Sequence, residues 1–223
     1  MIVAAHVTES ETRARLLQAA CAVFAAQGFR AATVREICGQ AGVNVAAVGY
    51  HFGSKEALYA EALKASALRV VAQYPATGEL ADGAAWQDRL RVFIGAVFAR
   101  MGAQGEQAWH GQMVSREMIE PTPALQGLVD EVIRPQAACL GAIVRDALGP
   151  AAPDAMVQAG ARSVIGQCLF YHHCRPVLER LDPAAACVFG PAQMEVLAAQ
   201  VADFSIAALQ ALSAGRAPAG GAR

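Results

Sequence analysis

The chain has 223 residues, of which 55% are hydrophobic and only 17% are charged, so it has enough apolar surface for a packed core and is not an intrinsically disordered protein. Aromatic residues make up 6% and alanine is abundant, a balance that favours closely packed helices over β-sheets. The formal net charge is −1, so any surface that binds nucleic acid has to be local. We therefore expect an all-α fold of one or two domains.

Cysteine usage and the N-terminal segment point to a cellular compartment. The six cysteines include no C-x-x-C pair and are scattered over predicted helices, which is unlike the disulfide framework of a short secreted chain. The first ten residues contain no basic residue and no long apolar core, so no signal peptide is predicted. No apolar stretch has the roughly 18 uninterrupted residues that a membrane span needs. These features predict a cytoplasmic protein with no membrane partner.

One longer and two short helical patterns open the chain. Apolar residues at spacings of three and four predict an amphipathic helix over 12–27, and a glycine ends it. Residues 33–36 (TVRE) have the S/T-x-x-E pattern of a capping box and predict a short helix that stops near Gly42. Asn44 is a good N-cap for a second short helix, which we expect to reach about Phe52.

Longer helices are predicted beyond this region. Ser54 caps a helix over 55–73, and the segment 74–84, which contains proline and glycine, is predicted to be a loop. The tail 214–223 contains only Ala, Gly, Pro and Arg without periodicity and is expected to be disordered. The other predicted helices lie at about 86–101, 106–119, 123–148, 154–174 and 191–212.

Two short helices joined by a turn with a glycine, after a longer amphipathic helix, form the arrangement of a helix-turn-helix, whose second short helix enters the major groove of DNA. The run FAAQGFRAATVREICGQAGVNVAAVGYHFGSKEALY, within residues 12–63, closely resembles the DNA-binding domain of the TetR family of bacterial transcriptional regulators. The residues that match the family pattern are Phe24, Gly28, Thr33, Val34, Ile37, Ala41, Gly42, Val43, Tyr50, His51, Phe52, Lys55, Leu58 and Tyr59. The resemblance implies a DNA-binding domain over 8–55, a helical effector-binding and dimerisation domain over 56–213, and operator DNA as partner.

The residues of this region suggest how DNA is contacted. The N-terminus of the first short helix and the donors that follow the second can bind phosphates, which position the protein. The second helix offers mainly small apolar side chains, which can contact thymine methyl groups, so specificity also involves DNA shape. Similar sequences more often carry Asn where this chain has Gly49. The DNA-binding candidates are Thr33, Arg35, Asn44, Val45, Ala46, Gly49, Tyr50, His51 and Lys55.

A second resemblance concerns the larger domain. The run 115–125 (SREMIEPTPAL), followed by 133–135 (IRP), looks like the CecR-type C-terminal domain of one branch of the family. In the same region His110, Met113, Glu117 and Met118 stand at spacings that can share a helix face. They form either an effector pocket or an ordinary core in which Glu117 pairs with an arginine. Both interpretations stay open from the sequence.

The last two long helices are predicted to form a dimer interface. Apolar residues of 191–212 lie on more than one side of the helix, which implies burial against the chain's own core and against a second subunit. Small residues of the preceding helix would let helices approach closely. The interface candidates are Gly160, Ser163, Gly166, Met194, Leu197, Val201 and Phe204.

Other functions find less support. Cys168 and His172 stand at i, i+4, but no further ligand pair has suitable spacing, so we predict packing or an interface role, no metal and no cofactor. No G-x-S-x-G, phosphate loop or H-E-x-x-H occurs, and no enzyme is predicted. The sequence therefore predicts a ligand-responsive DNA-binding homodimer, a repressor released by a small apolar or amphipathic effector. The alternative is a helical small-molecule binding protein without operator recognition, suggested by Gly49 and the nearly neutral charge.

Overall fold

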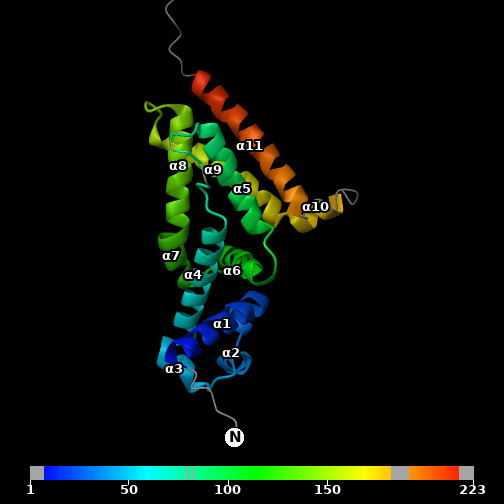
Figure 1. Ribbon diagram of the computed structural model, residues 1–223. Helices are drawn as coiled ribbons and strands as arrows, with labels where there is room; N and C mark the ends of the chain where they lie inside the picture. Colours follow the sequence, from blue (N-terminus) through cyan, green and yellow to red (C-terminus); the bar gives the residue numbers. More distant parts are fainter. Residues whose placement is uncertain (1–7, 79, 82, 182–190, 216–223) are drawn as a thin grey trace, which may run out of the picture. The chain divides into compact units, whose positions relative to one another are not determined.

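The computed structural model describes residues 8–78, 80–81, 83–181 and 191–215, which form helices and loops and no strand (Figure 1). The predicted all-α class is confirmed. The chain divides into two compact units. Unit 1 contains the described residues up to Val70 together with Gln104–Ile133, and unit 2 contains Val71–Ala103 and the described residues from Arg134 onward.

Unit 1 opens with α1 (Glu9–Ala31), which begins three residues before the predicted helix. A capping box at Thr8, which the predicted helix did not include, explains the earlier start: the Glu11 amide donates to Thr8 Oγ1 (3.2 Å) and the Thr8 amide donates to Glu11 Oε2 (2.7 Å). Gly28, at φ 80°, interrupts the helical backbone where the sequence placed its end. The glycine was therefore recognised correctly, but one more helical turn follows it.

The next helices of unit 1 are α2 (Val34–Ala41), α3 (Ala46–Phe52) and α4 (Lys55–Gln73), of which α4 belongs to unit 1 up to Val70. The Ser54 hydroxyl accepts from the Ala57 amide (3.1 Å), which confirms the predicted N-cap of α4. These helices pack with α1 around a common core because their apolar side chains recur at helical spacing. Its large fully buried side chains include Leu16, Phe24, Ile37, Leu58, Tyr59 and Leu63.

The rest of unit 1 consists of η1 (Gly105–Gln107), α6 (Ala108–Ile119), α7 (Ala124–Leu128) and the π-helical segment η2 (Val129–Ile133). Helix α6 packs against α1.

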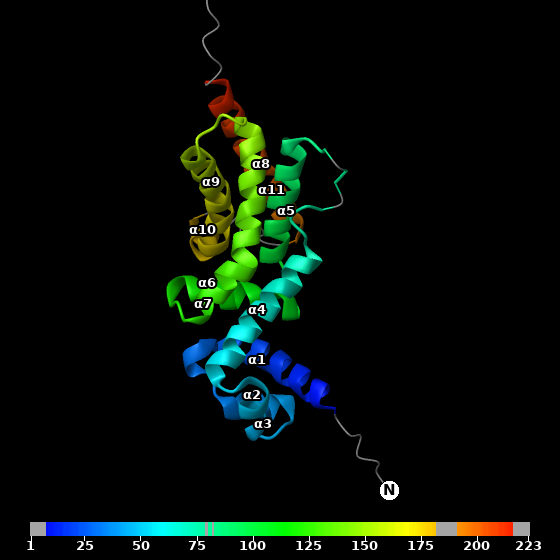
Figure 2. The same ribbon diagram turned by 90° about the vertical axis from the view of Figure 1, so that its left-hand side faces the viewer.

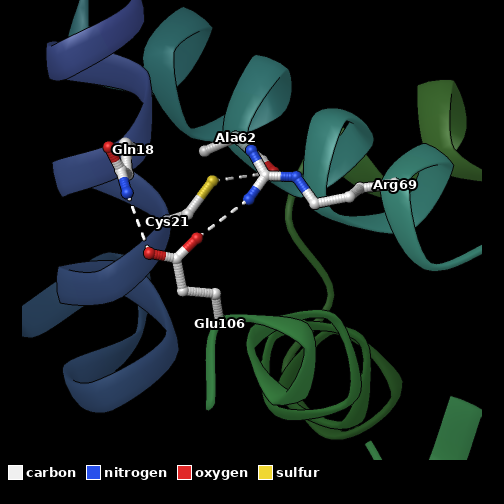
Figure 3. Close-up of polar contacts among 5 residues, drawn as sticks. All are labelled: Gln18, Cys21, Ala62, Arg69 and Glu106. Atoms are coloured by element: carbon white, nitrogen blue, oxygen red, sulfur yellow. Dashed lines mark hydrogen bonds and ion pairs between the residues drawn. The ribbon is translucent and has the colours of Figure 1, made fainter. Parts of the chain in front are cut away.

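A carboxylate in η1 links two helices of unit 1. Glu106 accepts from Gln18 Nε2 of α1 (2.8 Å) and from Arg69 Nη1 of α4 (3.2 Å), and Figure 3 shows it reaching toward both. In the same view Cys21 Sγ of α1 donates to the Ala62 carbonyl of α4 (3.5 Å). Side chains of α1 thus meet both α4 and η1.

Unit 2 is built from α5 (Trp86–Met101), α8 (Arg134–Leu148), α9 (Asp154–His173), α10 (Arg175–Leu181) and α11 (Pro191–Ala214). Helices α5, α8, α9 and α11 contact one another, and α10 packs on α9 (Figure 2). The predicted bounds of α5 are confirmed, and those of α9 and α11 differ by one or two residues. The core between these helices includes Leu90, Phe93, Ile94, Phe98, Ile143, Val144, Val164 and Leu197.

Two features of the helical pattern differ from the prediction. The single helix expected over 123–148 is interrupted by the π-helical turn of η2, which lies just before Pro135. Proline lacks an amide hydrogen and its ring crowds the preceding turn, so the ladder of hydrogen bonds is disturbed there. Helix α10 was missed because Pro176 looked like a helix breaker, although it stands at the second position of the helix, where proline is tolerated.

Helix α11 contains one segment, Gln193–Ala214, that is long and apolar enough to cross a membrane by length and composition. No stretch of the sequence has the roughly 18 uninterrupted apolar residues expected of a membrane span, and this segment contains Glu195 and Asp203. In the structure Met194, Leu197 and Val201 of this helix lie in the core of unit 2. One side of the helix thus belongs to the core, whereas Val196, Phe204 and Leu212 are exposed.

Candidate nucleic-acid interface

The first part of the candidate interface is the N-terminus of α2. Thr33 is exposed and accepts from the Glu36 amide through its hydroxyl oxygen (3.2 Å). The reciprocal half of the predicted capping box is replaced, because the Glu36 carboxylate accepts from Gln27 Nε2 instead. The Thr33 hydroxyl hydrogen can still be donated to a phosphate beside the first amides of the helix. Arg35, one residue into α2, is exposed as well.

The turn between α2 and α3 is set by one glycine. Gly42 has φ 65° and ψ 40°, the left-handed conformation that ends a helix, and the Val43 amide returns to the Cys38 carbonyl (3.0 Å). Arg15 of α1 donates to the Ala41 carbonyl, and a Cβ at position 42 would lie 2.7 Å from Arg15 Nη2. The turn is thereby held against α1.

Helix α3 presents the predicted recognition face. Asn44 Oδ1 accepts from the Ala46 amide (2.9 Å), but the helix starts at Ala46 and its N-cap is Val45, one residue later than the predicted cap. Val48 and Phe52 are buried against the other helices of unit 1. The candidates Asn44, Val45, Ala46, Gly49 and Tyr50 are exposed, and His51 is half-buried.

The phosphate-donor candidates in the last turn of α3 and just after it are partly engaged within the chain. Tyr50 is 73% exposed with its ring 4.9 Å from that of His51, and Glu9, through a hydrogen bond and its charge, raises the Tyr50 pKa. Lys55 Nζ donates to the Arg30 carbonyl (3.5 Å) and lies 4.7 Å from the centre of the Phe29 ring. An ammonium has three hydrogens, so Lys55 can serve the end of α1 and a phosphate together.

Fewer cationic side chains of this region are available to contact DNA than the sequence suggests. Residues 1–60 contain five basic and four acidic side chains, a net charge of +1. Arg13 pairs with Glu61 and lies over the Phe52 ring (4.8 Å), and Arg15 is bound to the Ala41 carbonyl. The interface therefore relies on a few donors near α2 and α3, which predicts moderate and salt-sensitive binding by a dimer and not tight binding by one copy.

Two glycines give a matched test of this architecture. Gly42→Ala should lower the free energy of unfolding by about 1–2 kcal/mol, because alanine is disfavoured at positive φ. Gly49 is helical, and a Cβ there meets nothing within 4 Å, so Gly49→Ala should raise the same quantity by about 1 kcal/mol. Chemical denaturation of both variants measures the two effects. Equal changes would show that the turn geometry does not matter.

The four effector candidates lie on α6 but do not share one face. Met113 and Glu117 are fully buried, His110 is half-buried, and Met118 is 50% exposed. Placing Met118 with the others was wrong, because one residue turns a helix by about 100° and Met118 directly follows the buried Glu117.

Glu117 is the polar centre of this region. Its carboxylate accepts from Tyr59 Oη (2.7 Å) and from the amide and the hydroxyl of Thr122 (both 3.0 Å). The partners of Glu117 are thus two hydroxyls and an amide, and not the arginine that one interpretation of the sequence predicted. Burial, followed by the hydrogen bond to Glu117, raises the pKa of Tyr59 well above its ordinary range. Sequence spacing gave no signal for this network, whose members come from α4, α6 and the loop after α6.

A cleft of about 210 Å³ opens beside this network within unit 1. Tyr59, Glu117 and Thr122 contribute to its wall, and neither Met113 nor Met118 does. The residues that line it are Gln27, Gly28, Phe29, Arg30, Tyr59, Arg116, Glu117, Ile119, Glu120 and Thr122.

The dimer candidates also need a correction. Met194, Leu197 and Val201 are buried in the core of unit 2, so these side chains have no surface left for a partner. The apolar stripe was read correctly as buried, but its partner is the chain itself. Phe204, in contrast, is 67% exposed. On α9 Ser163 and Gly166 are exposed, whereas Gly160 faces Val144 and Leu209 of the same unit.

The residues considered for a metal have other surroundings. Cys168 is fully buried, donates to the Val164 carbonyl (3.5 Å), and burial raises its pKa to about 12. Burial also lowers the pKa of His172. Among the described residues no group of three or more His, Cys, Asp or Glu side chains could hold a metal ion.

Comparison with known proteins gives two family matches. Residues 86–212 match the family described as the C-terminal domain of the HTH-type transcriptional dual regulator CecR, and residues 16–62 match the bacterial regulatory proteins of the tetR family. The HTH-type transcriptional dual regulator CecR of Shigella flexneri is 30% identical over 169 residues, which cover 72% of this chain and 75% of that protein.

Solved structures share the fold. A transcriptional regulator from Pseudomonas aeruginosa PAO1 has a TM-score of 0.68 at 24% identity, over 92% of this chain and 95% of that one. The TetR family transcriptional regulator PfmR from Thermus thermophilus has a TM-score of 0.62 at 21% identity, over 87% of this chain and 95% of that one.

Proposed function

Because the chain belongs to the TetR family of transcriptional regulators and carries a CecR-type C-terminal domain, we propose that it is a ligand-responsive repressor that binds a pseudo-palindromic operator as a homodimer. A small apolar or amphipathic effector releases it from the DNA. Members of this family are regulators and not enzymes. The observation that carries the proposal is the exposed surface of α3 and the α2 N-terminus on a buried helix-turn-helix core.

The recognition surface supports readout by small side chains. Val45, Ala46 and Gly49 leave room for α3 to lie close to base edges, where methyl groups of valine and alanine can contact thymine. Asn44 is occupied in part, because Oδ1 accepts from the Ala46 amide, and its amide hydrogens stay available to a base. Thr33 and Lys55 would hold phosphates on either side of the helix.

Exposed apolar surface on unit 2 supports a dimer. Phe204 and Val196 on α11 and Phe170 on α9 are each more than half exposed, which is costly for an isolated chain in water. Ser163 and Gly166 on α9 are small and exposed, so a partner helix could approach closely. A symmetric interface of α9 and α11 covers both sets of residues at once. Such a regulator would act in the cytoplasm.

The effector would be sensed through α6. The buried Glu117 joins α6 to Tyr59 on α4, the helix that follows the recognition unit, so a ligand that displaces α6 disturbs α4 as well. By linkage, effector and operator must weaken each other's binding by the same factor. The relative from Shigella flexneri is named a dual regulator. Whether binding of this protein represses or activates transcription is therefore tested by experiment.

DNA from upstream of the protein's own gene gives the first test. Fluorescence anisotropy with this fragment should show saturable binding that a shuffled fragment of the same length does not compete away. Equal affinity for both fragments would favour the alternative, a helical small-molecule binding protein without operator recognition. Transcription from the same fragment in a purified system then shows whether binding represses.

Phosphate contacts predict a specific pattern in variants. Lys55→Met keeps the packing over Phe29 but removes the charge, so it should weaken binding to all operator variants alike and reduce the salt slope by about one per bound subunit. Tyr50→Phe should weaken binding uniformly without changing the slope. Arg180→Met, which removes an exposed charge on α10, is the control and should change neither quantity. A changed base preference in Lys55→Met would contradict the assigned role.

A further inference from the structure

Unit 2 contains a cleft that none of the predicted sites uses. Its volume is about 480 Å³, which is within the range of small-molecule sites. One wall comes from the loop before α5, with Leu80, and the other comes from α8, with Cys139, Ala142 and Ile143. Arg89 of α5 and Asp146 of α8 also line it.

Arg89 leaves one donor unused at this cleft. Its guanidinium pairs with Asp146 through Nη2. The Nε–H group is shielded from solvent and has no hydrogen-bond partner in the described part of the chain. A buried donor without an acceptor costs about 1–3 kcal/mol. A ligand that enters the cleft and accepts a hydrogen bond from Arg89 Nε would remove this cost.

The charge around Arg89 favours a neutral ligand. Asp146 already balances the guanidinium, and a second anion would lie next to that carboxylate. Burial raises the pKa of the Cys139 thiol, which therefore stays protonated near neutral pH and adds no charge. Beyond Arg89 the walls of α8 are the small or apolar side chains of Ala142 and Ile143.

We propose that this cleft binds an uncharged small molecule with a compact apolar body and a carbonyl oxygen that accepts from Arg89 Nε. The apolar body lies along Ala142 and Ile143, and the carbonyl points toward α5. The proposal concerns binding by the protein without DNA. That such a ligand changes operator binding rests on the proposed function and is measured separately.

Butyrophenone and butylbenzene are the probes, because they differ by the carbonyl group and little in shape. Binding of each to the full chain is measured by ligand-observed NMR titration with the wild type and two variants. Arg89→Met removes Nε, whereas Asp146→Asn breaks the ion pair and keeps Nε. We expect Arg89→Met to weaken butyrophenone about tenfold or more and to leave butylbenzene within about twofold, as the loss of a charged hydrogen-bond donor implies. Asp146→Asn should leave both within about twofold.

Three outcomes of these titrations overturn the proposal. They are no saturable binding of butyrophenone by the wild type, equal effects of Arg89→Met on both compounds, and a loss in Asp146→Asn as large as in Arg89→Met. Circular dichroism shows whether each variant is folded, and if Arg89→Met is not, Ala142→Phe fills the cleft instead and should abolish binding of both probes.

Protection of Cys139 from alkylation shows whether the ligand lies in this cleft. Butyrophenone should slow alkylation of Cys139 by iodoacetamide, measured by mass spectrometry, and leave the half-buried Cys174 unaffected. Equal protection of both cysteines, or of neither, would place the ligand elsewhere. None of these readouts involves DNA, so a failure of operator binding leaves the result unchanged.

Discussion

Phe204→Glu is expected to give a folded monomer at micromolar concentrations at which the wild type is a dimer. Phe204 is 67% exposed on α11, so a charge there does not disturb the core of unit 2 and the helical circular dichroism should be unchanged. In a symmetric dimer each subunit would bury one unpaired carboxylate, so the dissociation constant should rise about a hundredfold or more, about 3 kcal/mol. Operator binding should fall with it, because two recognition helices are needed for two half-sites.

Two controls separate this effect from general damage. Ala138→Glu adds the same charge to an exposed position of α8 and should leave the dimer intact. Val201→Glu places the charge in the core of unit 2, where the sequence had expected the interface, and should unfold the chain. Sedimentation velocity measures the mass of each variant. A wild type that sediments only as a monomer, or a Phe204→Glu variant that stays dimeric, contradicts the proposed interface.

The helices could be predicted because their signals are local. Periodic apolar residues and flanking prolines and glycines placed α5, α9 and α11 within a residue or two of their observed bounds. The same reliance on local signals produced the errors. Pro176 suggests the end of a helix from sequence alone, although a first-turn proline is compatible with a helix, and the π-helical turn before Pro135 has no periodic signature.

The candidate sites were predicted less well because a pattern of buried residues does not show what covers them. The stripe of Met194, Leu197 and Val201 is buried, as its spacing indicates, but spacing cannot say whether a chain's own helices or a second subunit cover it. Exposure of the recognition residues followed from the family pattern. The contact between Tyr59 and Glu117 joins residues 58 positions apart, and no periodicity connects them.

That contact carries the second large effect. Glu117→Ala should lower the free energy of unfolding by about 2–4 kcal/mol, because Tyr59 Oη and the donors of Thr122 lose their acceptor in a buried site. Tyr59→Phe removes one donor and leaves Glu117 with two, so we expect a loss of about 1–2 kcal/mol. The exposed neighbour Met118 is the control, and Met118→Ala should cost about 0.5 kcal/mol or less.

Chemical denaturation of the two single variants and the double variant measures the coupling. If the hydrogen bond links α4 to α6, the double variant is more stable than the sum of the single losses implies, by about 1 kcal/mol. Additive losses would show that the two side chains act separately.

The dependence of stability on alkaline pH tests the hydrogen bond between Tyr59 and Glu117 independently. Burial and the hydrogen bond to Glu117 raise the pKa of Tyr59 above its ordinary value of 10.0, so the folded chain keeps a proton that the unfolded chain releases. The unfolded state then binds fewer protons than the folded state, and stability falls as pH rises through about 10. Tyr59→Phe lacks this proton. The stability difference between wild type and Tyr59→Phe should therefore be constant below about pH 9 and shrink above pH 10. A difference that stays constant up to pH 11 would mean that the Tyr59 hydroxyl meets water, and the link between α4 and α6 would then have to come from packing alone.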